Sequence, residues 1–110
     1  MRVENGPIRG DFMVSYKSAL KRISGGKTVK VEMEIRKGRI VKFMLSGDFF
    51  AYPPEQLEKL EKEFIGRKAD VETVAEILEG FRDKIELTGI SMDDIADLVN
   101  KLVMADTLHD

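Results

Sequence analysis

Residues 28–36 constrain the fold most strongly, because their side chains alternate strictly between polar and apolar. The apolar positions are Val29, Val31, Met33 and Ile35. A period of two places one face of a β-strand against a core and the other face in water. The pair Lys37-Gly38 follows and is typical of a tight turn, since glycine accepts a positive φ. Residues 39–46 are rich in β-branched and aromatic side chains, so they predict the second strand of a hairpin.

A lone hairpin is only marginally stable, and the remainder of the chain predicts helices to cover it. The first helix begins near Pro54, which suits a first turn, and ends at Gly66. Its apolar stripe is Leu57, Leu60, Phe64 and Ile65.

The second and third helices follow with favourable capping residues. Asp70 caps the second, which ends at Thr88-Gly89, and Ser91 caps the third. The predicted inner side of the second helix is Val71, Val74, Ala75, Leu78, Phe81, Arg82 and Ile85. The apolar stripe of the third is Ile95, Leu98, Val99, Leu102 and Val103.

Strands followed by helices predict an α+β fold. We expect a small antiparallel sheet, with its central hairpin at about residues 28–46, packed against about three α-helices. Residues 13–20 alternate loosely and indicate an edge strand, and residues 24–27 form a turn around Gly25 and Gly26. We expect an irregular lead-in over about residues 1–12, and 110 residues match the size of one domain, 1–110.

The composition offers few residues of the types that usually act in catalysis. The chain has no cysteine, which excludes thiolate chemistry and Cys-based zinc sites, and its one histidine is His109. The acidic pairs on the predicted helices have no apolar pocket to shift their pKa values, so we interpret them as solvated. No apolar run approaches the ~20 residues of a membrane span. We therefore expect a soluble cytoplasmic protein without a membrane partner.

The charges are distributed unevenly along the chain. Residues 1–45 hold eleven Lys and Arg against four acids, a net +7, and residues 46–110 hold seven against sixteen, a net −9. The basic half is either a solvated sheet face or a surface that directs a partner or ligand. A nucleic-acid partner is disfavoured, because the pI is about 5.5 and no RNA- or DNA-binding motif accompanies the basic residues.

Residues 47–54 break both periodicities. Two prolines disfavour a central strand there. Adjacent aromatics point to opposite sides of an extended segment, so either Phe49 or Phe50 is exposed as an anchor for a partner, or both lie buried under the helices. The best-supported role for Asp48 is that of a turn-former.

Several short motifs occur in a specific order. They are Gly25-Gly26-Lys27, the turn at Gly38, Gly47-Asp48-Phe49-Phe50, Tyr52-Pro53-Pro54-Glu55, Ile65-Gly66 and Leu87-Thr88-Gly89-Ile90-Ser91. In this order the chain resembles the accessory domain of lipoate–protein ligases over about residues 16–104. That domain is usually the C-terminal part of a bacterial ligase and, in many archaea, a separate small subunit. Residues 1–15 have no clear counterpart.

The resemblance implies a non-catalytic subunit that forms a heterodimer with a catalytic ligase subunit. The pair adenylates lipoate with ATP to lipoyl-AMP. It then transfers the lipoyl group to a lysine on an acceptor domain of a 2-oxoacid dehydrogenase or glycine cleavage protein. Lipoate, ATP and Mg²⁺ belong to the partner, and this chain alone is expected to bind no cofactor.

No catalytic residue of the family can be matched to a position here. The candidates for docking on the partner and closing its adenylate site are Lys27, Asp48, Phe49, Phe50 and Tyr52. The structural positions of the motifs are Gly25, Gly26, Gly38, Gly47, Pro54, Gly66 and Gly89. Two alternatives stay open, an independent protein-interaction module and a nucleic-acid-binding domain that uses the basic N-terminal half.

Overall fold

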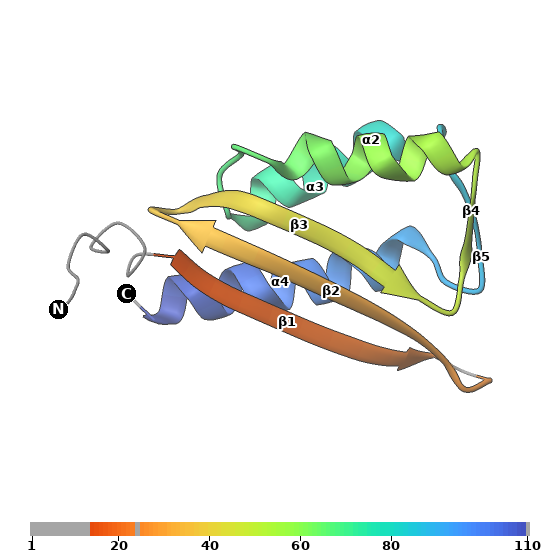
Figure 1. Ribbon diagram of the computed structural model, residues 1–110, viewed down its shortest axis with the longest axis horizontal. Coiled ribbons are helices and arrows are strands. Elements are labelled where there is room, and N and C mark those ends of the chain that lie inside the picture. Colours follow the sequence, from red (N-terminus) through yellow and green to blue (C-terminus); the bar gives the residue numbers. More distant parts are fainter. Residues whose placement is uncertain (1–13, 24, 110) are drawn as a thin grey trace, which may run out of the picture.

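The computed structural model describes residues 14–23 and 25–109, and it has two layers, a sheet and a set of helices (Figure 1). Its elements are β1 (Val14–Ile23), β2 (Lys27–Arg36), β3 (Arg39–Gly47), β4 (Phe50–Tyr52), α2 (Pro54–Phe64), α3 (Val71–Phe81), β5 (Glu86–Thr88) and α4 (Met92–His109). Strands β1, β2 and β3 form an antiparallel sheet in that order, and β4 pairs with β5 in a second antiparallel sheet. The predicted α+β fold is confirmed, and the predicted lead-in at 1–12 lies outside the described residues.

The central hairpin forms where the period of two predicts it. The four apolar residues of β2 are at most 2% exposed, and from β3 Ile40, Phe43 and Leu45 are buried beside them. A β-bulge between Glu34 and Ile35 shifts the register near the turn. Lys37 and Gly38 both have positive φ, as a two-residue hairpin turn requires.

The predicted edge strand is confirmed and is longer than expected. β1 pairs with β2 from Val14↔Arg36 to Ile23↔Lys27, and the turn that joins them contains Gly25 and Gly26, both with positive φ. β1 therefore runs the full length of the hairpin.

Helix α2 begins at Pro54, as predicted, and packs on β3. Leu60 and Phe64 are fully buried, and the Phe64 ring stacks on Phe43 with centroids 4.0 Å apart. The prediction for Ile65 is wrong, because the helix ends at Phe64 and the extended backbone at Ile65 turns its side chain outward. Gly66 follows with a φ of +83°, in keeping with its role as the helix stop.

Helix α3 begins after Asp70, whose carboxylate accepts a 2.8 Å hydrogen bond from the Thr73 amide. Its buried stripe is Val74, Ile77, Leu78 and Phe81. Ile77 was not predicted to be part of this stripe, and the prediction that Val71, Ala75 and Arg82 lie inside is wrong. A stripe that starts at position 74 turns these three side chains to the rim of the helix.

The predicted extension of α3 to Thr88 is wrong. The helix ends at Phe81, and residues Glu86–Thr88 form β5, which pairs with β4. A strand of three residues carries no measurable period, and its partner lies more than thirty positions away, so neither strand has a local signal.

Helix α4 agrees with the prediction. Its five predicted apolar residues are all at most 6% exposed, and in Figure 1 the helix runs behind the three-stranded sheet. The core lies between this sheet and the helices. Within residues 14–23 and 25–109, no element covers the opposite face of the sheet, where Tyr16, Leu20 and Met44 are exposed. Among the described residues, no helix is both long and apolar enough to cross a membrane.

Candidate functional site

Four of the six motifs from the sequence meet at one end of the molecule, where β2 begins, β3 ends and the β4–β5 ribbon leads to α2 (Figure 1). The turn at Gly38 and the pair Ile65-Gly66 lie together at the other end of the hairpin. Asp48 links two segments of the first end. Its carboxylate Oδ2 accepts hydrogen bonds from the Thr28 amide (3.3 Å) and the Thr28 hydroxyl (3.1 Å). The Asp48 amide donates in return to the Thr28 carbonyl oxygen at 2.8 Å. Asp48 therefore forms a clasp, a set of hydrogen bonds that joins β2 to the segment after β3.

Gly47 makes this clasp possible. Its φ is +143°, and a Cβ at this position would lie 2.3 Å from the Thr28 carbonyl oxygen and 2.8 Å from Val29 Cα. Both contacts are with backbone, which has no flexible end that can move away. Only glycine permits β3 to end this close to β2.

Gly89 lies against the same clasp from the other side. A Cβ on Gly89 would lie 3.1 Å from the Asp48 carbonyl oxygen and 3.4 Å from Lys27 Cδ. The aliphatic part of the Lys27 side chain therefore passes beside Gly89, next to the β4–β5 ribbon. Within residues 14–23 and 25–109, Lys27 forms no ion pair, and the residue is exposed.

The two adjacent aromatics take opposite orientations, as expected for an extended segment. Phe49 is half-buried and packs against the core, whereas Phe50 is 77% exposed. Tyr52 is 69% exposed and lies two positions from Phe50 on the same strand, so both point to the same side. This end of the molecule thus presents a pair of large exposed aromatic side chains on a paired strand.

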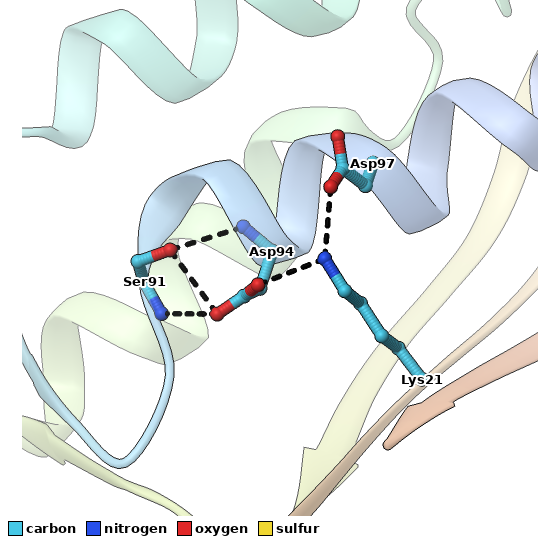
Figure 2. A network of polar contacts seen from close by, with 4 residues as sticks. All are labelled: Lys21, Ser91, Asp94 and Asp97. Carbon is cyan, nitrogen blue, oxygen red and sulfur yellow. Dashed lines mark hydrogen bonds and ion pairs between the residues drawn. The ribbon is translucent and has the colours of Figure 1, made fainter. Parts of the chain in front are cut away.

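Part of the positive charge of the N-terminal half is neutralised nearby. Figure 2 shows the Lys21 ammonium group between two carboxylates of α4, Asp94 at 2.9 Å and Asp97 at 2.8 Å. These hydrogen bonds raise the pKa of Lys21 above its ordinary value. The same contact with Lys21, helped by bonds from Ser91, lowers the pKa of Asp94.

Some basic residues of the N-terminal half therefore form ion pairs with acidic residues of the C-terminal half. Besides Lys21, Lys17 on the same strand lies 3.9 Å from Asp106 of α4. These lysines hold β1 to α4 and are occupied by that contact. Lys27 lies outside this set, which keeps it among the candidates for contact with a ligand.

Three further residues contribute to this end and were not among the candidates from the sequence. Thr28 holds the Asp48 carboxylate, Thr88 lies opposite Phe50, and Glu86 lies opposite Tyr52. Each partnership joins residues at least twenty positions apart. In the sequence, only the short motif around Gly89 pointed to the segment that holds Thr88 and Glu86.

The cavities described for this molecule lie elsewhere. A cavity of about 360 Å³ opens on the uncovered sheet face beside Tyr16 and Met44, and another of about 320 Å³ lies between α2 and α3 beside Arg67 and Phe81. Within the described part of the chain, no three His, Cys, Asp or Glu side chains are grouped so that they could hold a metal ion. The end built around Asp48 is thus an exposed surface of apolar and basic side chains.

Residues 11–99 match the family of the bacterial lipoate protein ligase C-terminus. The chain belongs to this family. No curated protein sequence matches the chain. A solved structure does match this lipoate protein ligase C-terminal domain, with a TM-score of 0.67 and 20% sequence identity, over 79% of this chain and 97% of the other. It comes from an archaeal lipoylation system of Thermoplasma acidophilum, a bi-partite lipoate protein ligase and its E2 lipoyl domain.

The family match confirms the resemblance seen in the short motifs, and the solved structure confirms the fold. The match includes the whole of the end built around Asp48, from Lys27 to Gly89. It also covers β1 and the first part of α4, as far as Val99. The surface described above thus lies within the part of the chain that matches the ligase family.

Proposed function

We propose that this chain is the accessory subunit of a two-chain lipoate–protein ligase. It docks on a catalytic subunit and is required there for the ATP-dependent formation of lipoyl-AMP, before transfer to a lysine of a lipoyl-acceptor domain. The observation that carries the proposal is the family match over residues 11–99 of a 110-residue chain. The bi-partite nature of the similar Thermoplasma ligase supports a partner on a separate chain.

Docking is assigned to the exposed aromatic pair. Phe50 and Tyr52 stand on a strand that is paired with β5 and leads directly into α2. Side chains held by a paired strand lose little further freedom on binding, and aromatic anchors dominate the energy of many interfaces. Asp48 fixes the start of this strand through Thr28, and Phe49 anchors it to the core.

In this proposal, Lys27 provides electrostatic stabilisation of the adenylation reaction. Adenylation develops negative charge on phosphate, which a fixed cation in a closed site stabilises. The bonds between Asp48 and Thr28 fix β2 next to Lys27, whose side chain passes beside Gly89, the residue after β5. Docking of this end over the partner's adenylate site would also exclude water from a reactive anhydride. ATP, Mg²⁺ and lipoate are placed in the catalytic subunit.

The docking part is tested by binding to the catalytic subunit, measured by calorimetry. Phe50→Ala with Tyr52→Ala is expected to weaken binding by at least about 30-fold, the scale of an interface hot spot. The matched control is Val71→Ala with Met104→Ala, two other exposed apolar residues, on α3 and α4. Equal affinities for the wild type and the aromatic variant, with native circular dichroism, would remove this end from the interface.

The role of Lys27 is tested separately from docking. Lys27→Ala is expected to bind the catalytic subunit normally and to lower the rate of lipoyl-AMP formation about tenfold. Lys37→Ala is the control, because Lys37 is an exposed lysine at the opposite end of the same hairpin. An unchanged adenylation rate in the Lys27 variant takes this residue out of the site.

A further inference from the structure

The two edges of the three-stranded sheet differ in how they are covered. Along the outer edge of β3, the Leu45 amide donates to the Glu61 carboxylate at 2.8 Å, and the Ile40 amide donates to the Arg67 carbonyl oxygen at 2.9 Å. The Gly66 amide donates to the Ile40 carbonyl oxygen of the same strand, and the Ala69 amide donates to the Gly38 carbonyl oxygen in the turn before it. No such contact from the described residues covers the outer edge of β1, which is ten residues long (Figure 1).

A long open edge normally carries outward charges or bulges that prevent pairing with another chain. The register of β1 with β2 turns Lys17 and Lys21 toward the helical layer, where aspartates of α4 neutralise them. On the opposite, open face of β1 stand Tyr16 and Leu20, which are 59% and 56% exposed. Ser18 and Arg22 are also exposed on this face, and among the described residues of β1 Arg22 is its exposed charge, near one end of the strand. The middle of the strand therefore lacks the usual protection and presents Tyr16 and Leu20 on either side of Ser18.

We infer that the edge of β1 pairs antiparallel with β1 of a second copy of this chain, with the twofold axis through Ser18. In an antiparallel pair about this axis, Tyr16 of each copy lies directly opposite Leu20 of the other. The symmetric contact thus contains two equivalent Tyr16–Leu20 pairs, and each pair shields both side chains from water. Aromatic–aliphatic pairs of this kind are the stabilising unit of a sheet.

The charges along β1 favour this register over its neighbour. With the axis through Ser18, Lys17 faces Ala19 of the second copy and Lys21 faces Ser15. With the axis through Ala19, Lys17 of each copy would face Lys21 of the other, and like charges directly opposite are destabilising. The strand is therefore self-complementary in one register, and the product is a continuous six-stranded sheet.

This inference is independent of the ligase role, because it concerns the chain without its catalytic partner. The first test is sedimentation equilibrium of the full chain over about 1–500 µM, a range that resolves micromolar to submillimolar Kd values. The wild type is expected to dimerise, and Leu20→Lys to raise the dimer Kd at least about tenfold, because it sets a lysine opposite Tyr16. Met44→Lys is the control, since Met44 is equally exposed at 57%, on the same open face but on β3.

The second test fixes the register. The chain has no cysteine, so Ser18→Cys and Ser46→Cys each introduce a single thiol at an exposed serine of the open face. Under mild oxidation Ser18→Cys is expected to form disulfide-linked dimers several-fold faster, because residues on the axis face each other with Cβ atoms about 5 Å apart. A wild type that stays monomeric up to the highest concentration overturns the inference. So does equal dimerisation by the two lysine variants, or equal cross-linking by the two cysteine variants.

Discussion

At the scale of the residue, Gly47 decides whether the end built around Asp48 can form. Its backbone combines a positive φ with contacts to Thr28 and Val29 that leave no room for a methyl group. Gly25 also has a positive φ, +90°, yet an added Cβ there would meet nothing within 4 Å. A comparison of the two glycines therefore separates the energetic cost of a positive φ from the cost of a steric clash.

Substitution of these glycines gives the first prediction. Gly47→Ala is expected to lower the free energy of unfolding by at least about 3 kcal/mol, since β2 or β3 must shift to admit the methyl group. Gly25→Ala is expected to lower it by about 1 kcal/mol, the cost of a left-handed backbone alone. Urea denaturation measures both values. Equal losses in the two variants would mean that the close approach at Thr28 is absent.

The residues of the site differ in how far their roles could be predicted. The opposite orientations of Phe49 and Phe50 follow from the alternation of any extended segment, and the structure bears out the exposed alternative. The partner of Asp48 could not be predicted, because twenty positions separate it from Thr28. What Lys27 contacts in a complex stays a prediction.

At the scale of the element, long periodic segments were predictable and short ones were not. The hairpin and α4 each repeat their burial pattern over several turns or pleats, so each carries its own evidence in the sequence. The strands β4 and β5 exist only because they pair with each other, through Phe50↔Thr88 and its two neighbours. Ile65 was misplaced for a related reason, since apolar spacing does not reveal where a helix ends.

The contact of β1 with α4 yields a prediction about pH. Folding lowers the pKa of Asp94 below its ordinary 3.8, so its contribution is present above that value and is lost as the pH falls through the folded pKa. Folding raises the pKa of Lys21 above 10.5, so its contribution is present below 10.5 and is lost at higher pH. The pair therefore stabilises the fold across the neutral range.

Removal of the lysine should expose this dependence. Lys21→Met is expected to be less stable than the wild type at about pH 6–9, and the difference should shrink as the pH falls below about 4. Unfolding free energies from urea denaturation over a pH series provide the measurement. Lys42→Met is the control, because Lys42 is 75% exposed and lies 3.9 Å from its nearest acid. A difference for Lys21→Met that does not vary with pH would contradict the assigned ion pair.

At the scale of the whole molecule, the two proposed surfaces are separated. The aromatic pair and Lys27 lie at the end where β4 and β5 join the sheet to α2, whereas the free edge of β1 lies along the far side of the sheet (Figure 1). The chain offers exposed surfaces for docking and, within its described part, no group of metal ligands. A subunit that acts by completing another chain's site needs only such surfaces.

The most direct test of the accessory role is lipoyl-AMP formation by the catalytic subunit, measured with lipoate, ATP and Mg²⁺ in the presence and absence of this chain. We predict that adenylation is slow for the catalytic subunit alone, reaches its full rate at one equivalent of this chain, and is not restored by the variant that lacks Phe50 and Tyr52. Adenylation that proceeds at the same rate without this chain would contradict the proposed function.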